Sequence, residues 1–169
     1  MHGTSPTDPG RTIDWGKTSG DYSKFRPGTP DSFYERLRVL GLGLPKQKIL
    51  DFGTGTGVLA RRFAEQGSDA CGIDISAEQI EAAKTLADEQ KLKIDFRVSA
   101  AEKTPFADHS FDAISANQCF LYFDKPKVIP EIRRLLKPGG FLSTSHFSWL
   151  PRQDELARET EKLVLKHNP

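Results

Sequence analysis

Three alternate glycines follow an acid at the end of an apolar run. Residues 49–59 read ILDFGTGTGVL, so that Asp51 precedes Gly53, Gly55 and Gly57. A tight turn that needs positive φ would require one glycine, whereas three at alternate positions let a ligand approach the backbone closely. The N–H groups at the start of the following helix are then available as donors. We therefore predict a ligand-binding loop that also includes Thr54.

The spacing of these residues narrows the choice of ligand. The dinucleotide-binding fingerprint is Gly-x-Gly-x-x-Gly/Ala after a strand, and Val58 stands where its third small residue would be. Asp74 follows 21 positions after Gly53 at the end of an apolar run, where an ionised carboxylate can accept hydrogen bonds from both hydroxyls of a ribose. Dinucleotide enzymes share such an acid, so Asp74 predicts a nucleoside ligand without identifying it.

Three further stretches accompany the glycine loop. They are CGIDIS at Asp74, SAAEKTPFADHSFDAISAN after the third predicted strand, and RRLLKPGGFLS before the fifth. Together with the acid-x-Gly-x-Gly-x-Gly spacing, this ordered set resembles the class I S-adenosylmethionine (SAM)-dependent methyltransferases over about residues 37–147. The resemblance implies a Rossmann-like, doubly wound α/β fold with a mainly parallel sheet in strand order 3-2-1-4-5.

The resemblance also implies which residues contact the adenosine half of SAM. Asp74 would bind the ribose, Ile75 would lie against the adenine, and the backbone N–H of Ala101 would meet a ring nitrogen. Ala100 replaces the acid that commonly binds the adenine amine in relatives, and Glu102 is the candidate for the substitute acceptor. The alternative for Glu102 is a solvated loop acid.

On the methionine half, the resemblance places the ammonium near Asp51 and the carbonyls around Gly53. The carboxylate would meet N–H groups of the loop. Asn117 and Gln118, a polar pair just after the fourth predicted strand, would contact the methionine portion and the methyl acceptor. A helix cap is the alternative for this pair.

The remaining candidates lie near the two ends of the resemblance. Tyr22 and Arg26 belong to a segment that often covers SAM in relatives, where Arg26 would pair with the carboxylate unless it is an ordinary surface arginine. Tyr122 falls near an aromatic or histidine that lines the methyl-transfer site, with core packing as its alternative. His146 would serve as a base, or else be a packed, hydrogen-bonded residue. Methyl transfer is an in-line displacement, and we expect no catalytic metal.

Hydrophobic periodicity and helix-stop signals predict the elements that position these residues. Strands alternate with helices, which indicates βαβ units and a parallel sheet. The predicted strands are 48–52, 70–75, 94–98, 112–116 and 140–147, and the predicted helices are 30–40, 57–65, 77–91, 127–136 and 153–166. Ligands of such sheets bind beyond the carboxyl ends of the strands, where the glycine loop and Asp74 would meet.

Composition and charge narrow the classes of function. The 169 residues suit one SAM-binding domain over 21–169, preceded by a flexible segment over 1–20. The formal charge is +1 and no basic cluster is interleaved with aromatics, so we expect neither nucleic acid nor a membrane surface as partner. Cys71 and Cys119 lie in apolar stretches without metal-ligand spacing, which favours two reduced, buried cysteines in a cytoplasmic protein.

The end of the chain affects both fold and function. The family sheet ends in an antiparallel hairpin, and the 22 residues after Phe147 are too few to hold it. We expect the apolar fifth strand to be covered by the last helix, the N-terminal segment or another copy, which would give a homodimer. The expected function is methyl transfer from SAM to a small-molecule acceptor. A SAM-binding module without catalysis and an NAD-dependent oxidoreductase are the alternatives.

Overall fold

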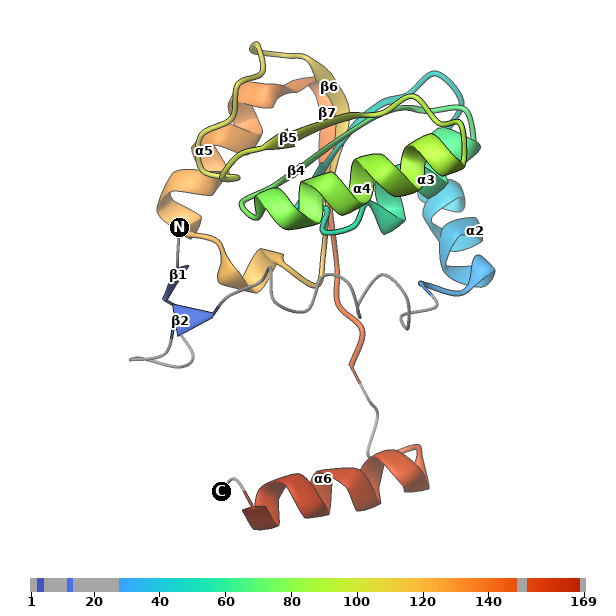
Figure 1. Cartoon of the computed structure of the whole chain (residues 1–169), viewed down its shortest axis with the longest axis vertical. Coiled ribbons are helices and arrows are strands. Elements are labelled where there is room, and N and C mark those ends of the chain that lie inside the picture. The colour runs from blue at the N-terminus through green and yellow to red at the C-terminus, as the bar shows by residue number, and fades with distance from the viewer. Residues whose placement is uncertain (1–2, 5–11, 14–27, 149–151, 168–169) are drawn as a thin grey trace.

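A five-stranded parallel sheet forms the centre of the molecule (Figure 1). The computed structural model of the chain describes residues 3–4, 12–13, 28–148 and 152–167. The strands of the sheet are β3 (Lys48–Phe52), β4 (Asp69–Asp74), β5 (Asp95–Val98), β6 (Phe111–Asn117) and β7 (Leu136–Ser145). Their spatial order is β5-β4-β3-β6-β7 with every pairing parallel, which confirms the predicted order 3-2-1-4-5.

Helices cover both faces of this sheet. The helices that belong to this body are α2 (Asp31–Val39), α3 (Val58–Glu65), α4 (Ala77–Glu89), the short 3₁₀ helix η1 (Phe120–Tyr122) and α5 (Lys125–Leu135), and the last helix, α6 (Glu155–His167), lies apart from the sheet. Phe63 of α3 packs with Ile49 of β3, whereas Ile132 of α5 packs with Leu50, the next residue of the same strand. Successive strand side chains point to opposite faces, so α3 and α5 lie on opposite sides and the sheet is doubly wound, as predicted.

Local sequence signals explain why α4 forms where it does. The side chain of Ser76 accepts a hydrogen bond from the backbone N–H of Gln79 at 3.2 Å, so Ser76 is the N-cap of α4. The apolar stripe of Ile80, Ala83 and Ala87 is buried. Cap and stripe together hold the first turn of α4 beside the carboxyl end of β4.

The start of the fifth strand differs from the prediction. The helix before it ends at Leu135, and β7 begins at once with Leu136, so the Pro-Gly-Gly run lies inside the strand. Phe111 pairs with Leu136, whereas Ala113 pairs with Phe141. The extra residues of β7 therefore form a bulge instead of a turn between helix and strand.

Within the described residues, β7 is an edge strand whose one strand partner is β6, and no antiparallel hairpin lies beside it. Helix α6 has no buried residue, and Leu156 and Leu163 on it are exposed. Figure 1 shows α6 apart from the sheet. Of the three expected covers of this edge, the last helix is therefore not the one that the described residues show.

The segment expected to be flexible contains one described feature. β1 (Gly3–Thr4) and β2 (Thr12–Ile13) pair as a two-stranded antiparallel sheet. The rest of residues 1–20 lies outside the described part of the chain.

Candidate functional site

A cavity of about 440 Å³ opens at the carboxyl ends of β3, β4 and β6, where the strand order reverses. Its size lies within the range of small-molecule sites. The lining consists of Gly53, Gly55, Asp74, Ile75, Gln79, Ser99, Ala101, Glu102, Asn117, Gln118, Cys119, Tyr122 and Phe123. A smaller cavity of about 250 Å³ lies beside α2 and α3, and its described lining includes none of the predicted site residues.

The three glycines of the loop share a left-handed conformation but make different contacts. Their φ angles are +58° at Gly53, +56° at Gly55 and +77° at Gly57. Gly53 and Gly55 line the cavity, and a Cβ added at Gly55 would have Gln79 Oε1, 3.8 Å away, as its nearest neighbour. A Cβ at Gly57 would lie 2.7 Å from the ring of Phe96. Gly55 therefore leaves space for a ligand, whereas Gly57 permits close packing inside the protein.

Asp51 lies beneath the glycine loop and is not part of the cavity lining. It is 3% exposed, and its two oxygens accept hydrogen bonds from Ser115 Oγ at 2.6 Å and from Thr54 Oγ1 at 2.8 Å. Burial raises the pKa of Asp51 to about 6, although both hydrogen bonds act to lower it. Asp51 and the buried Thr54 therefore hold the shape of the loop, and the expected contact of the Asp51 carboxylate with the ammonium stays a prediction.

Asp74 joins the loop to the start of α4 and also lines the cavity. Its Oδ2 accepts a hydrogen bond from the N–H of Gly55 at 3.0 Å, and its Oδ1 accepts one from the N–H of Ser76 at 2.9 Å. Burial raises the pKa of Asp74, while these backbone hydrogen bonds act in the opposite direction. Each carboxylate oxygen has a further lone pair, so Asp74 can still accept hydrogen bonds from ligand hydroxyls.

The expected adenine side of the cavity combines apolar side chains with one acid. Ile75 is exposed, Ala101 is buried, and both line the cavity. Glu102 also lines it, and its Oε1 accepts a hydrogen bond from the backbone N–H of Asp124 at 3.0 Å. Glu102 is therefore not simply a solvated loop acid, because it connects the segment between β5 and β6 to the start of α5.

The polar pair at the end of β6 is held by the end of β7. Asn117 Oδ1 accepts a hydrogen bond from Ser145 Oγ at 2.8 Å, and Gln118 Nε2 donates one to the carbonyl of Phe147 at 3.0 Å. Gln118 has φ +65°, a conformation that is costly for a residue other than glycine and that concentrates at functional sites. Both side chains line the cavity with their positions set by neighbouring strands.

The two candidate catalytic residues differ in position. Tyr122 lines the cavity and is 41% exposed, so it is not a core residue. His146 follows the end of β7 and is exposed, so it is not the packed residue that was its alternative. It does not line the cavity. Tyr22 and Arg26 lie outside the described residues.

Sequence reasoning misses four cavity residues, which are Gln79, Ser99, Cys119 and Phe123. Cys119 was expected to be buried like Cys71 but is only partly so, and its Sγ donates a hydrogen bond to the carbonyl of Phe52 at 3.1 Å. Burial raises the pKa of the Cys119 thiol, which favours the protonated form. Its place directly after the predicted polar pair was the signal that could have found it.

The chemistry of the lining restricts the ligand. It contains the carboxylates of Asp74 and Glu102 but, among the described residues, no Lys or Arg. The N–H of Gly55, which a pyrophosphate would need as donor, already donates to Asp74. Two carboxylates without a cationic side chain suit a nucleoside that carries a positively charged sulfonium. They suit a dinucleotide less well, because its pyrophosphate is negatively charged.

Two further findings concern only the described part of the chain. It holds no group of three or more His, Cys, Asp or Glu side chains that could bind a metal ion. It also has no helix with the length and apolar character needed to cross a bilayer.

Comparison with known families identifies the family of the chain. A family profile described as "Methyltransferase domain" matches residues 50–144, which is more than half of the chain. The chain belongs to this family of methyltransferase domains. The matched range begins inside β3 and ends inside β7, so it contains the glycine loop, Asp74 and the end of β6.

Individual relatives of this methyltransferase domain agree with the assignment. An uncharacterized methyltransferase of Mycobacterium tuberculosis is 29% identical over 155 residues, which cover 90% of the chain and 59% of the relative. A demethylmenaquinone methyltransferase of Renibacterium salmoninarum is 34% identical over 117 residues, which cover 68% of the chain and 48% of the relative. The chain therefore spans about half the length of these curated relatives.

A solved structure supports the fold. The structure of a putative SAM-dependent methyltransferase from Methanococcus maripaludis aligns with a TM-score of 0.71 at 22% identity, covering 94% of the chain and 75% of that protein. At this identity the similarity establishes the Rossmann-like fold of the methyltransferase domain.

Proposed function

We propose that the protein binds SAM in the carboxyl-end cavity and transfers its methyl group to a small-molecule acceptor. The observation that carries this proposal is the convergence of the open backbone at Gly55, the carboxylate of Asp74 and the apolar Ile75 on one cavity. Asp74 would accept hydrogen bonds from the ribose hydroxyls, and Ile75 and Ala101 would contact the adenine. Bound SAM would supply the electrophilic methyl group.

The protein's own contribution is alignment, because a sulfonium leaving group needs no activation. The side chain of Asn117 is held by Ser145 of β7 and that of Gln118 by the carbonyl of Phe147 just beyond the strand, and both would orient the methionine portion and the acceptor. Tyr122 lies in the lining beside them and is the candidate for contact with the acceptor. His146, beyond the end of β7, is the candidate base for a hydroxyl or amine acceptor.

The acceptor class rests on a relative and on the apolar surface near the site. One relative is named a demethylmenaquinone methyltransferase, which makes quinone-like acceptors the first to test. Leu121 and Tyr122 of η1 and Phe147, two residues beyond the end of β7, are exposed. An apolar ring would find suitable contacts there.

Labelled methyl transfer tests this proposal. The whole chain would be incubated with methyl-labelled SAM and, separately, quinone-like, lipid-like and amine acceptors, while calorimetry measures binding of SAM, S-adenosylhomocysteine (SAH) and NAD. We expect SAM and SAH to bind at about micromolar concentration, one acceptor class to become labelled, and NAD not to bind. Preferential binding of NAD would show that the oxidoreductase alternative is correct.

A second candidate is SAM binding without catalysis. One observation favours it: the chain spans 59% of one relative and 48% of another. Regions that help to form the acceptor pocket in relatives can therefore lie outside the match. The two candidates differ in one outcome. Binding of SAM and SAH without transfer to any acceptor class would support the second.

We also propose a cytoplasmic homodimer that binds neither nucleic acid nor membrane. The unpaired edge of β7 supports self-association, and the formal charge of +1 argues against anionic partners. Cys71 and Cys119 are both free thiols, as is usual in a reducing compartment.

A further inference from the structure

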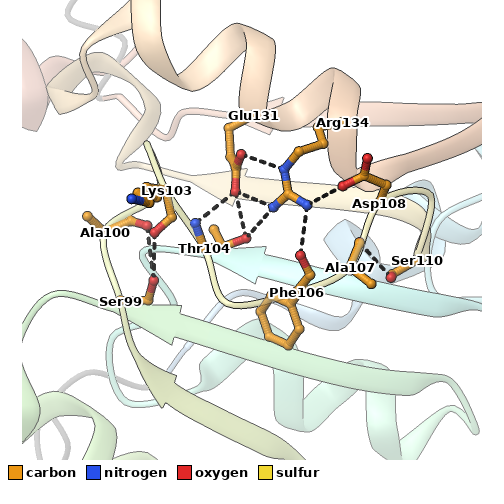
Figure 2. A network of polar contacts seen from close by, with 10 residues as sticks. All are labelled: Ser99, Ala100, Lys103, Thr104, Phe106, Ala107, Asp108, Ser110, Glu131 and Arg134. Carbon is orange, nitrogen blue, oxygen red and sulfur yellow. Dashed lines mark hydrogen bonds and ion pairs between the residues drawn. The ribbon is translucent and has the colours of Figure 1, made fainter.

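A dense polar network links α5 to the segment between β5 and β6, outside the cavity (Figure 2). Glu131 Oε1 accepts hydrogen bonds from the backbone N–H of Thr104 at 2.7 Å and from Thr104 Oγ1 at 2.8 Å. Arg134 donates to both oxygens of Glu131, at 2.8 Å from Nε and 2.7 Å from Nη2. We call Glu131, Arg134 and Thr104 the Glu131 network.

Arg134 extends this network further along the same segment. Its Nη1 donates to the carbonyl of Phe106 at 2.8 Å and to Asp108 Oδ1 at 2.6 Å. Figure 2 shows that these contacts converge on one guanidinium and one carboxylate, both carried by α5. Residues 99–110 contain no helix or strand, so the Glu131 network supplies contacts that regular structure would otherwise provide.

The carboxylate at the centre is buried and its hydrogen-bonding capacity is well used. Glu131 is 9% exposed, and its hydrogen bonds with Arg134 and Thr104 lower its pKa to about 2. Removing one partner from such a network leaves a buried polar group without its bond, which is more costly than losing an exposed ion pair. Glu131 therefore stays ionised throughout the neutral pH range, where it can accept the hydrogen bonds of Arg134 and Thr104.

This connection acts on a wall of the candidate cavity. Ser99, Ala101 and Glu102 line the cavity and precede Thr104 by only a few residues. A second hydrogen bond, from the N–H of Asp124 to Glu102, joins the same segment to the start of α5. Helix α5 also closely follows η1, whose Tyr122 lines another wall. One helix therefore connects two walls of the cavity.

We propose that Glu131 is a positioning residue for ligand binding: through Thr104 it sets the wall formed by residues 99–102, without contacting the ligand itself. The inference rests on the proposed function, because it assigns that wall to the adenosine half of SAM. The same geometry explains why a polar threonine stands at position 104. Its N–H and hydroxyl both satisfy the buried carboxylate.

The test compares Glu131→Gln with Glu65→Gln in the whole chain. Glu65 also pairs with an arginine three residues away, Arg62 at 3.2 Å, but lies on α3 outside this cavity. The amide introduced by Glu131→Gln has a single acceptor oxygen, so this variant loses part of the paired contact with Arg134. We expect the dissociation constant for SAH, measured by calorimetry, to rise roughly fivefold or more in Glu131→Gln and to be unchanged in Glu65→Gln.

A second readout needs no ligand. Backbone amide exchange over residues 99–104 should become faster in Glu131→Gln while exchange in α3 and β3 is unchanged. If Glu131→Gln does not fold, Thr104→Val removes one donor with little change in shape, and Thr104→Ser, which keeps the hydroxyl, should restore the affinity that Thr104→Val loses.

Three outcomes overturn the inference: an SAH affinity within twofold of wild type, an equal loss in Glu65→Gln, or unchanged amide exchange over residues 99–104. A wild-type chain that does not bind SAH contradicts the proposed function instead. In that case the exchange measurement still decides whether the Glu131 network holds the segment.

Discussion

Single residues of the glycine loop have different roles although they look equivalent in sequence. Gly53 and Gly55 line the cavity, whereas Gly57 packs against Phe96. Asp51 supports the loop from below through Thr54 and Ser115. Substitution at each position should therefore lower either the affinity for the ligand or the stability of the fold.

Alanine substitutions separate these roles. Gly55→Ala places a methyl group in open cavity space at φ +56°, so it should cost about 1–2 kcal/mol of unfolding free energy and weaken SAH binding about tenfold. Gly57→Ala adds a contact of 2.7 Å with the Phe96 ring to a similar backbone strain, so it should cost about 3 kcal/mol or more. Urea denaturation and calorimetry check both values. Equal effects of the two variants on stability would contradict the assignment of Gly57 to packing.

The raised pKa of Asp51 predicts a pH dependence of stability. Its pKa is about 6 in the folded chain against an ordinary value of 3.8, so the folded state binds more protons between these values. Stability from this group is therefore present at low pH and is lost as pH rises through about 4 to 7, by an amount on the order of 3 kcal/mol.

Asp51→Asn removes this titration. The unfolding free energy of the variant relative to wild type should rise between about pH 4 and pH 7, even if a changed hydrogen bond adds a constant offset. Denaturant unfolding at a series of pH values measures the difference. Parallel curves for wild type and variant would show that Asp51 does not titrate in this range.

At the scale of elements, apolar runs and stop signals predict most of the architecture. The Ser76 cap and the stripe on α4 act within a few residues, so their consequences can be predicted from local sequence. Asp51 meets Ser115 and Glu102 meets Asp124 only because the chain folds back, 64 and 22 positions later. Such long-range pairs explain why the individual roles of Asp51 and Glu102 could not be predicted.

The same limit applies to the last helix, which was one of the three expected covers of the fifth strand. Leu135 of α5 is fully buried, whereas Leu163 of α6 is 60% exposed. Leu135→Ala should cost about 2–5 kcal/mol of unfolding free energy, and Leu163→Ala less than about 0.5 kcal/mol. Thermal or denaturant unfolding provides the comparison. A loss of more than about 1 kcal/mol in Leu163→Ala would show that α6 packs against the protein in solution.

At the scale of the whole molecule, we expect the outer edge of β7 to pair with another copy of the chain. Its edge has no strand partner among the described residues, and Phe141 and Leu142 on it are only partly buried. Strand edges of this kind associate unless they are covered. Pairing of two copies through β7 would give a symmetric dimer.

Sedimentation equilibrium tests this expectation. We expect a dimer that Thr144→Lys converts to monomer, because a lysine on an edge strand hinders strand pairing and Thr144 is already exposed. Lys162→Ala on α6 serves as the control for a change of charge elsewhere. A wild-type monomer at all concentrations, or a dimer unaffected by Thr144→Lys, would contradict pairing through β7.

The most direct test of the whole account is a crystal structure of the protein with SAH. We expect the ribose hydroxyls within hydrogen-bonding distance of Asp74, the adenine between Ile75 and Ala101, and the amino-acid portion toward Asn117 and Gln118. SAH bound in the cavity beside α2 and α3, or in the main cavity with its ribose away from Asp74, would contradict it.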